Sequence, residues 1–518
     1  MNSAVDKKHT PPAEAVDNTD IIETAIIGAG FGGIGLAIRM QQQGLQDFLI
    51  FEKADDVGGV WRDNIYPGAA CDVPSHLYSF SFEPNPDWGR RFSPQQEIYS
   101  YLQYCTRKHN LKDKLCYGHE LNSMRFDEER GLWIIEFTEG RRQLARSVVM
   151  AIGALNIPQY PNIKGLQDFK GRLMHTAEWD AEFKPNGKRI AVIGTGASAI
   201  QAIPELQKTA DSLAVFQRTP PWVMPKFDKK IKPSEARRFR RFPFLQRLSR
   251  GVQYSIAESV VLGFLWDSFL TRIFEKVGRS HLRKVIKDPV LREKLTPSYS
   301  MGCKRVLLSD DYYPALQKPN VSLIDSGISH IDETGVVDAN GQHHELDAIV
   351  LATGFKVPVA GSPMPVYGMA GRNLNDDWAE GSEAYKGMTV SGYPNMLYMM
   401  GPNTGPGNTS VIYYIESQIH YALKYLKRLR RQPEHYLDLR KDVQRRFNDD
   451  LQAKMEGTTW TSGCNSWYLT PSGKNTTLWP SFSWRYRLMT KKFTFADYYA
   501  FKVEPDQLET SDEQVLAS

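Results

Sequence analysis

The chain is poor in cysteine, and its cysteines follow no known ligand or redox spacing. Its 518 residues include five, none of them in a Cys-x-x-Cys pair: Cys71, Cys105, Cys116, Cys303 and Cys464. A scattered, odd-numbered set argues against a disulfide framework, a zinc site and a disulfide reductase, and it is typical of a reducing cytoplasm. We therefore expect no disulfide framework, no bound metal and a cytoplasmic location.

Long hydrophobic runs and a strong charge imbalance are also absent. The nearest candidate for a membrane span, Val260–Trp266, has seven residues between Glu258 and Asp267, whereas a bilayer requires roughly 20. The net charge of +5 is too small at this length to indicate a nucleic-acid partner. Residues 1–20 lack the apolar stretch of a secretory signal and predict a flexible leader, and the polar tail after Val503 predicts a loose segment.

What the sequence has is a strand, glycine turn, helix and strand in succession, and this pattern occurs twice. The first copy places these elements at Glu23–Gly28, Ile34–Gln43 and Phe48–Glu52. The second places them at Arg189–Gly194, Ala197–Lys208 and Leu213–Gln217. Two more apolar strands are expected at Ser147–Ile152 and Asp347–Thr353. The pattern predicts an α/β fold with two Rossmann-like dinucleotide-binding domains, each built on a parallel sheet.

The first glycine turn carries a complete dinucleotide fingerprint. Gly28, Gly30 and Gly33 have the spacing that allows a tight turn, the approach of a pyrophosphate and close packing of the helix on the strand. The following helix N-terminus offers free N–H groups to the phosphates. Glu52 ends the next strand, nineteen residues after the last glycine. A carboxylate there accepts hydrogen bonds from ribose hydroxyls, so the site predicts FAD or NAD.

The second turn reads Gly194-Thr195-Gly196-Ala197-Ser198-Ala199, with alanine as an allowed variant of the third glycine. The residue after the following strand is Arg218, nineteen residues beyond Ala199. A guanidinium at that place pairs with a 2′-phosphate, so this site predicts NADPH. An acidic first site and a basic second site indicate two different dinucleotides, FAD and NADPH, and hence a flavoprotein oxidoreductase that relays a hydride.

These patterns divide the chain into discontinuous domains. We assign 21–160 and 385–518 to an FAD-binding domain, 161–220 and 297–384 to an NADP-binding domain, and 221–296 to a helical insertion. Within the insertion, residues 236–250 interleave arginines with Phe and Leu. Such a segment can lie on an anionic membrane surface. We favour a packed apolar face and a solvated charged face over peripheral membrane contact.

Between the two nucleotide patterns, five residues resemble the signature F-x-G-x-x-x-H-x-x-x-W-[P/D] of type I Baeyer–Villiger monooxygenases, within the flavin-containing monooxygenase superfamily. They are Phe169, Gly171, His175, Trp179 and Asp180. A second stretch, Gly58–Asp72, resembles the family's G-G-x-W-x-x-x-x-Y-P-G-x-x-x-D segment and contains Trp61. Lys304-Arg305 is similar to the family's active-site Lys-Arg pair, and the resemblance extends from Ile22 to Tyr498.

The resemblance implies that NADPH reduces FAD, that O2 then forms a peroxyflavin, and that this species converts a ketone to an ester or lactone. It implies that Arg305 is the fixed catalytic cation and that Asp72 orients it. Lys304 is implied to bind the 2′-phosphate together with Arg218, next to Thr219. Trp467 resembles a tryptophan near the nicotinamide ribose. His175 and Trp179 are expected to be structural, as are Phe169 and Gly171, and Trp61 is expected to contact a cofactor.

Two other functions stay open at this point. One is a related flavin monooxygenase that acts on an amine or a sulfide, since its nucleotide sites would be nearly the same. The other is an uncoupled NADPH oxidase or a non-catalytic FAD and NADP(H) sensor. The sequence does not name the ketone, although the resemblance places Gly407-Asn408-Thr409 beside its pocket. Oligomeric state is not predicted.

Overall fold

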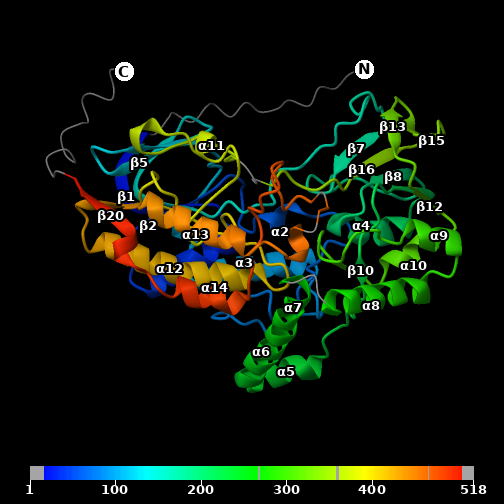
Figure 1. Cartoon of the computed structure of the whole chain (residues 1–518), viewed down its shortest axis with the longest axis horizontal. Coiled ribbons are helices and arrows are strands. Elements are labelled where there is room, and N and C mark those ends of the chain that lie inside the picture. The colour runs from blue at the N-terminus through cyan, green and yellow to red at the C-terminus, as the bar shows by residue number, and fades with distance from the viewer. Residues whose placement is uncertain (1–16, 266–268, 358–360, 462, 465, 504–518) are drawn as a thin grey trace, which may run out of the picture.

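The computed structural model describes residues 17–265, 269–357, 361–461, 463–464 and 466–503. The expected flexible leader up to residue 16 and the tail after Val503 lie outside the described residues. The described chain forms two lobes, each built on its own sheet, which lie side by side along the longest axis (Figure 1). This confirms the predicted α/β class with two dinucleotide-type sheets.

The first sheet has the strand order β17-β4-β5-β6-β1-β2-β3. Its parallel part joins β1 to β2 and β6, and β2 to β3, while β4, β5 and β6 are antiparallel. The long strand β6 pairs with β5 at its start and with β18 at its end. The bounds are β1 Asp17–Ile27, β2 Phe48–Glu52, β3 Leu115–Tyr117, β4 Leu121–Asp127, β5 Leu132–Phe137, β6 Arg142–Met150, β17 Val366–Tyr367 and β18 Met396–Tyr398.

Three helices cover one face of this sheet: α1 Phe31–Gln42, α3 Gln95–Lys108 and α12 Val411–Arg430. Their apolar residues form one core with Ile26, Ile50, Val149 and Leu397 of the strands. The opposite face carries a second core around the fully buried Trp133. Because β17 already pairs with β4, the chain returns to the first sheet by Val366. That is earlier than residue 385, where the sequence placed the return, so this boundary is corrected.

The second sheet is wholly parallel, in the order β12-β9-β8-β16-β7. Successive residues of a strand face opposite sides, and Ile190 and Val192 pack under α4 while Ala191 and Ile193 face a separate core. The bounds are β7 Arg172–His175, β8 Arg189–Ile193, α4 Ala197–Gln207, β9 Ser212–Phe216, α10 Tyr312–Leu316, β12 Val321–Ile324 and β16 Ala348–Leu351. A small antiparallel sheet of β13 Ile328–Ile331, β14 Gly335–Asp338 and β15 His343–Glu345 lies beside it.

The chain crosses between the two sheets along two strands that bond to each other. One crossing follows β6 and the other follows β16. They form an antiparallel bridge between Pro158 and Phe355. Gln159 N donates to Gly354 O at 2.8 Å, and Lys356 N donates to Ile157 O at 2.8 Å. The connection between the lobes is therefore a paired, hydrogen-bonded ribbon.

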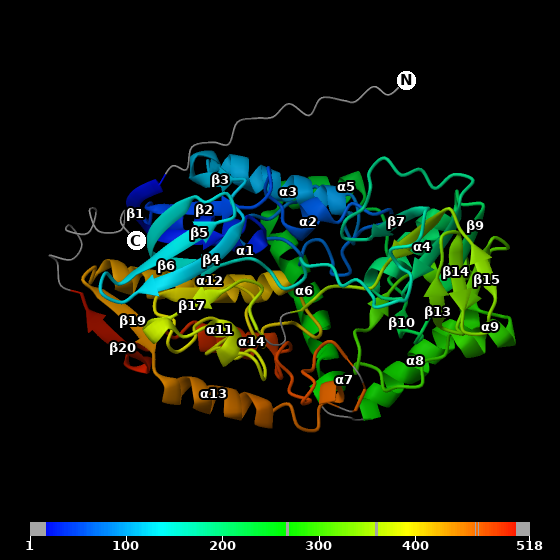
Figure 2. The same cartoon turned by 90° about the horizontal axis from the view of Figure 1, so that it is seen from above.

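The predicted insertion is helical, and its first part projects below and between the two lobes (Figure 1). Seen from above, α6 lies between the two lobes (Figure 2). The helices are α5 Pro233–Arg241, α6 Pro243–Val260, α7 Leu262–Leu265, α8 Phe269–Val285 and α9 Pro289–Lys294. The rest of the first lobe adds α2 Val60–Asp63, α13 Lys441–Ala453, α14 Ser483–Thr490 and an antiparallel pair of strands, β19 His435–Leu439 with β20 Tyr498–Lys502. In the part of the chain that the structure describes, no helix is long and apolar enough to cross a membrane.

Candidate active site

The first glycine turn has the geometry that its fingerprint predicts. Gly28 has φ +104°, a conformation that side chains rarely adopt. A Cβ added at Gly33 would lie 1.9 Å from the carbonyl oxygen of Gly28, so only glycine lets α1 begin this close to β1. Gly30 lies against Gly59 of the segment 58–72, since a Cβ added at Gly59 would be 3.3 Å from the Cα of Gly30. The turn and the N-terminus of α1 form the cradle that a dinucleotide pyrophosphate requires.

Glu52 lies at the end of β2, as predicted, and it is only 5% exposed. Its Oε2 accepts a hydrogen bond from Ala29 N at 2.8 Å, within the glycine turn. Its Oε1 accepts from Arg62 Nη1 at 3.1 Å. Arg62 was not predicted from the sequence, where its only signal is its place after Trp61 in the motif. Trp61 itself packs edge-on against Tyr78 and donates Nε1–H to the hydroxyl of that tyrosine at 3.1 Å.

The second glycine turn opens α4 in the same way. Gly194 has φ +112°, and a Cβ added at Gly196 would meet no atom within 4 Å, so the turn is open toward an incoming group. The side chain of Thr195 donates to the carbonyl of Thr219 at 3.1 Å and thereby ties the turn to the segment after β9. Ser198, in the first turn of α4, lies against the hydroxyl of Tyr66 from the first lobe.

Arg218 and Lys304 lie close enough to repel each other. Partial burial of Lys304 and the positive charge of Arg218 both hold the pKa of the Lys304 ammonium below its usual value. Neither side chain forms an ion pair with any carboxylate among the described residues. Two neighbouring cations without a carboxylate are the arrangement that an anionic group such as a phosphate would neutralise.

Asp72, at the end of the segment 58–72, and Arg305, after the helical insertion, form an ion pair. Arg305 Nη2 lies 2.5 Å from Asp72 Oδ2, with 24% of the aspartate side chain exposed and 43% of the arginine side chain. Burial favours the neutral carboxyl, but the charges of Arg305 and Lys226 outweigh it and lower the pKa of Asp72. The carboxylate in turn raises the pKa of Arg305 above its ordinary value. Both groups are therefore ionised at any working pH.

Two neighbours of this pair were not predicted. Lys226 lies near enough to stabilise the Asp72 carboxylate. Tyr468 is 5% exposed, and burial raises the pKa of its hydroxyl to about 12, against the opposing effect of the Arg305 charge. Both residues reach the pair from segments distant in sequence, so no local pattern signals them. Trp467, beside Tyr468, is 43% exposed and contacts that ring at 4.5 Å between centroids.

The motif segment 58–72 locks the two lobes together. Tyr66 donates its hydroxyl to Gln201 Oε1 at 2.8 Å, and Gln201 Nε2 donates to Ala70 O at 2.9 Å. A Cβ added at Gly68 would lie 2.3 Å from Gln201 O on α4. Gln201 was not predicted either. This contact holds the segment that carries Asp72 against α4, the helix that follows the second glycine turn.

The signature residues have structural contacts. Phe169 is buried, and a Cβ at Gly171 would collide with its ring at 2.4 Å. His175, at the end of β7, is 1% exposed and lies between Tyr160 and Phe355, one from each crossing strand, with ring centroids at 5.5 and 6.2 Å. Burial lowers its pKa, so the imidazole is neutral at pH 7. Trp179 packs edge-on against Phe183, and Asp180 forms an ion pair with Arg172.

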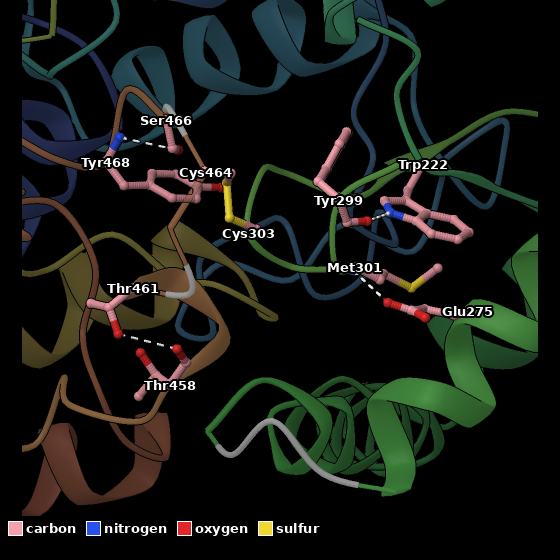
Figure 3. Close-up of a disulfide and its surroundings, with 10 residues drawn as sticks. All are labelled: Trp222, Glu275, Tyr299, Met301, Cys303, Thr458, Thr461, Cys464, Ser466 and Tyr468. Carbon is pink, nitrogen blue, oxygen red and sulfur yellow. Dashed lines mark hydrogen bonds between the residues drawn. A yellow bond between two sulfur atoms is a disulfide. The ribbon is translucent and has the colours of Figure 1, made fainter. Parts of the chain in front are cut away.

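One expectation about the cysteines is wrong. Cys303 and Cys464 form a disulfide across 161 positions, which joins the loop before Lys304 to the segment that leads to Tyr468 (Figure 3). Cys71, Cys105 and Cys116 are free. Sequence spacing did not reveal the bond because its partners meet only after both lobes have folded. The cysteine-based argument for a reducing cytoplasm loses its support. No group of His, Cys, Asp and Glu in the described part of the chain could hold a metal ion.

Comparisons with known proteins agree with this geometry. Residues 25–246 match the family described as Pyridine nucleotide-disulphide oxidoreductase. A relative from Pseudomonas aeruginosa named Baeyer-Villiger monooxygenase is 48% identical over 482 residues, which cover 92% of this chain and 91% of the relative. Among solved structures, an oxidised steroid monooxygenase bound to NADP has a TM-score of 0.83 and 28% identity, covering 93% of this chain and 100% of that chain. The OTEMO complex with FAD and NADP has a TM-score of 0.82 and 25% identity, with 93% and 99% covered.

Proposed function

Because this chain belongs to the family of Baeyer–Villiger monooxygenases, we propose that its site inserts one oxygen atom of O2 beside a ketone carbonyl. Ketone, O2, NADPH and a proton become ester or lactone, water and NADP+. Bound FAD and NADPH supply the hydride and the activation of O2. The observation that carries the proposal is the ion pair of Asp72 and Arg305, which fixes a permanent cation where the two nucleotide lobes meet.

The residues present fit both cofactors. For FAD, the glycine turn of α1 offers backbone N–H groups to the pyrophosphate, and Glu52 stands at the ribose end of β2. Gly28, Gly30, Gly33 and Trp61 complete that side. For NADPH, the open turn of Gly194, Thr195, Gly196 and Ser198 takes the pyrophosphate. Arg218 and Lys304, next to Thr219, take the 2′-phosphate, whose double negative charge relieves their mutual repulsion.

Arg305 acts as the catalytic cation in this proposal. Negative charge develops on the carbonyl oxygen of the ketone when its carbon is attacked, and a fixed guanidinium stabilises that charge. Asp72 holds the guanidinium in place by the 2.5 Å contact, so little reorganisation is needed during the reaction. His175 is neutral and lies against both crossing strands, so we assign it a structural role. Trp467 is assigned to the nicotinamide side, where its exposed ring can cover the cofactor.

The test is a product analysis under oxygen-18 gas. The purified flavoprotein is incubated with NADPH and a panel of ketones and thioethers, and the products are analysed by mass spectrometry. We expect one labelled atom at the bridging oxygen of an ester or lactone. Arg305→Ala should still consume NADPH in the reductive step but form almost no ester. If only sulfoxides or stoichiometric hydrogen peroxide appeared with every substrate, the proposed reaction would be wrong.

A further inference from the structure

Helix α6 has its polar and apolar faces reversed. Four apolar side chains spaced by four residues form one stripe along its outer side, which we call the apolar stripe. They are Phe244, Leu248, Val252 and Ile256, and they are 62%, 61%, 52% and 60% exposed. The i, i+4 spacing keeps them on one face of the helix. The sequence predicts that this apolar face is packed, and the structure contradicts that prediction.

The inward face of α6 is polar and is satisfied by the first lobe. Arg250 Nη1 donates to His76 O at 2.5 Å and to Ser79 O at 2.9 Å. Further along the helix, Glu258 is 7% exposed and accepts a hydrogen bond from Ser483 N at 2.6 Å. Hydrogen bonds to charged groups hold the helix firmly. The orientation is therefore determined by polar contacts, and it leaves the apolar stripe facing outward.

Exposed apolar surface of this kind marks an interaction site, because a monomer gains nothing by leaving it in water. The charge around the stripe indicates its partner. Between Pro233 and Val260 the chain has six arginines and two glutamates, and one of these, Glu258, is buried. Arg237, Arg238, Arg241 and Arg247 are exposed, and none forms an ion pair with another described residue. Arg240 alone pairs, with Asp87.

We propose that α5 and α6 dock on an anionic phospholipid surface. The apolar stripe enters the boundary between headgroups and acyl chains, and the arginines contact lipid phosphates. The helix lies along the surface and does not cross it. Pairing with a second copy of the chain suits the stripe less well, because it would bring two sets of unpaired arginines together. A bilayer surface instead supplies the opposite charge.

The test uses the full-length flavin-loaded protein and vesicles. We expect co-sedimentation with phosphatidylcholine vesicles that contain phosphatidylglycerol, weak binding to phosphatidylcholine alone, and release by high salt. Leu248→Asp with Val252→Asp should lower the partition coefficient at least about tenfold, since two apolar side chains are lost from the interface. Arg238→Gln and Arg241→Gln should each lower it about fivefold. Flavin absorbance and NADPH oxidation should stay unchanged in all these variants.

The matched control is Val290→Asp, which changes an apolar side chain of similar exposure, 63%, at the start of α9. It should bind vesicles like the original protein. Failure to bind either kind of vesicle, or equal loss in the control, would overturn the proposal. So would concentration-dependent dimers in sedimentation velocity that the Leu248→Asp and Val252→Asp changes abolish, because the stripe would then belong to a second copy.

Discussion

Replacing Arg218 by alanine should reduce the preference for NADPH over NADH rather than lower activity with both coenzymes equally. The structure places this guanidinium beside the Lys304 ammonium, with no described carboxylate to neutralise either. The 2′-phosphate of NADPH is the group that both would bind, and NADH lacks it. Loss of one cation should therefore raise the KM for NADPH and leave the KM for NADH nearly unchanged.

The magnitude follows from the exposure of the two cations. A hydrogen bond to a charged group contributes about 1.5–3 kcal/mol, and Arg218 is exposed, which favours the lower end. About 1.5–2 kcal/mol corresponds to a 10- to 30-fold rise in the KM for NADPH. Since Lys304 binds the same phosphate, the double variant should lose less than the sum of the two single losses. Arg218→Ala should also let the pKa of Lys304 rise toward its ordinary value.

Steady-state kinetics with both coenzymes across pH provide the assay. In the original protein, Lys304 should lose its proton earlier than an ordinary lysine as pH rises, so the KM for NADPH should increase at alkaline pH. In Arg218→Ala that increase should move to higher pH. Lys294→Ala is a useful control, because this lysine pairs with Asp325 on the same lobe. Equal losses with NADPH and NADH, or strictly additive losses in the double variant, would refute the shared phosphate site.

Three further outcomes are expected. Asp72→Asn should slow ester formation by about 100-fold while sparing flavin reduction, because a misplaced cation costs roughly that much. A wild-type rate of ester formation in this variant would contradict the role of Asp72. Since the folded pKa of Asp72 is depressed, the ion pair should be intact throughout neutral pH and be lost only as acid protonates this carboxyl. Cys464→Ser should lower the thermal midpoint measured by calorimetry and remove its dependence on reductant, whereas an unchanged midpoint would show that the bond to Cys303 adds no stability. Gly33→Ala should lose bound FAD and cost at least about 1–3 kcal/mol in denaturant unfolding, because the new methyl group overlaps a backbone carbonyl; retained flavin content would argue against the packing of this turn.

Local patterns predicted the fold well because the relevant forces act over short stretches. The strands and helices around Gly28 and Gly194 are where the fingerprint placed them, since a glycine turn and the apolar run before it determine each other's geometry. The role of Arg218 was predicted by the same rule, from its distance to the glycines, and it stays a prediction.

Residues that meet across the fold were not predictable in this way. Tyr468 approaches Arg305, and Gln201 receives Tyr66, only after distant segments have packed. The bond from Cys303 to Cys464 is another such contact. The faces of α6 were misjudged for a different reason: amphipathic spacing identifies two faces of a helix but does not say which of them points inward. Here buried polar contacts decide the orientation.

The hydrogen-bonded ribbon between the lobes has a mechanical consequence. A single linker would let one lobe swivel about its own axis, but two antiparallel strands joined at Pro158 and Phe355 resist twisting. They can still bend perpendicular to their length. The contacts of segment 58–72 with Gln201 and the Cys303–Cys464 disulfide tie the lobes as well, so the two nucleotide turns should keep one fixed register relative to each other.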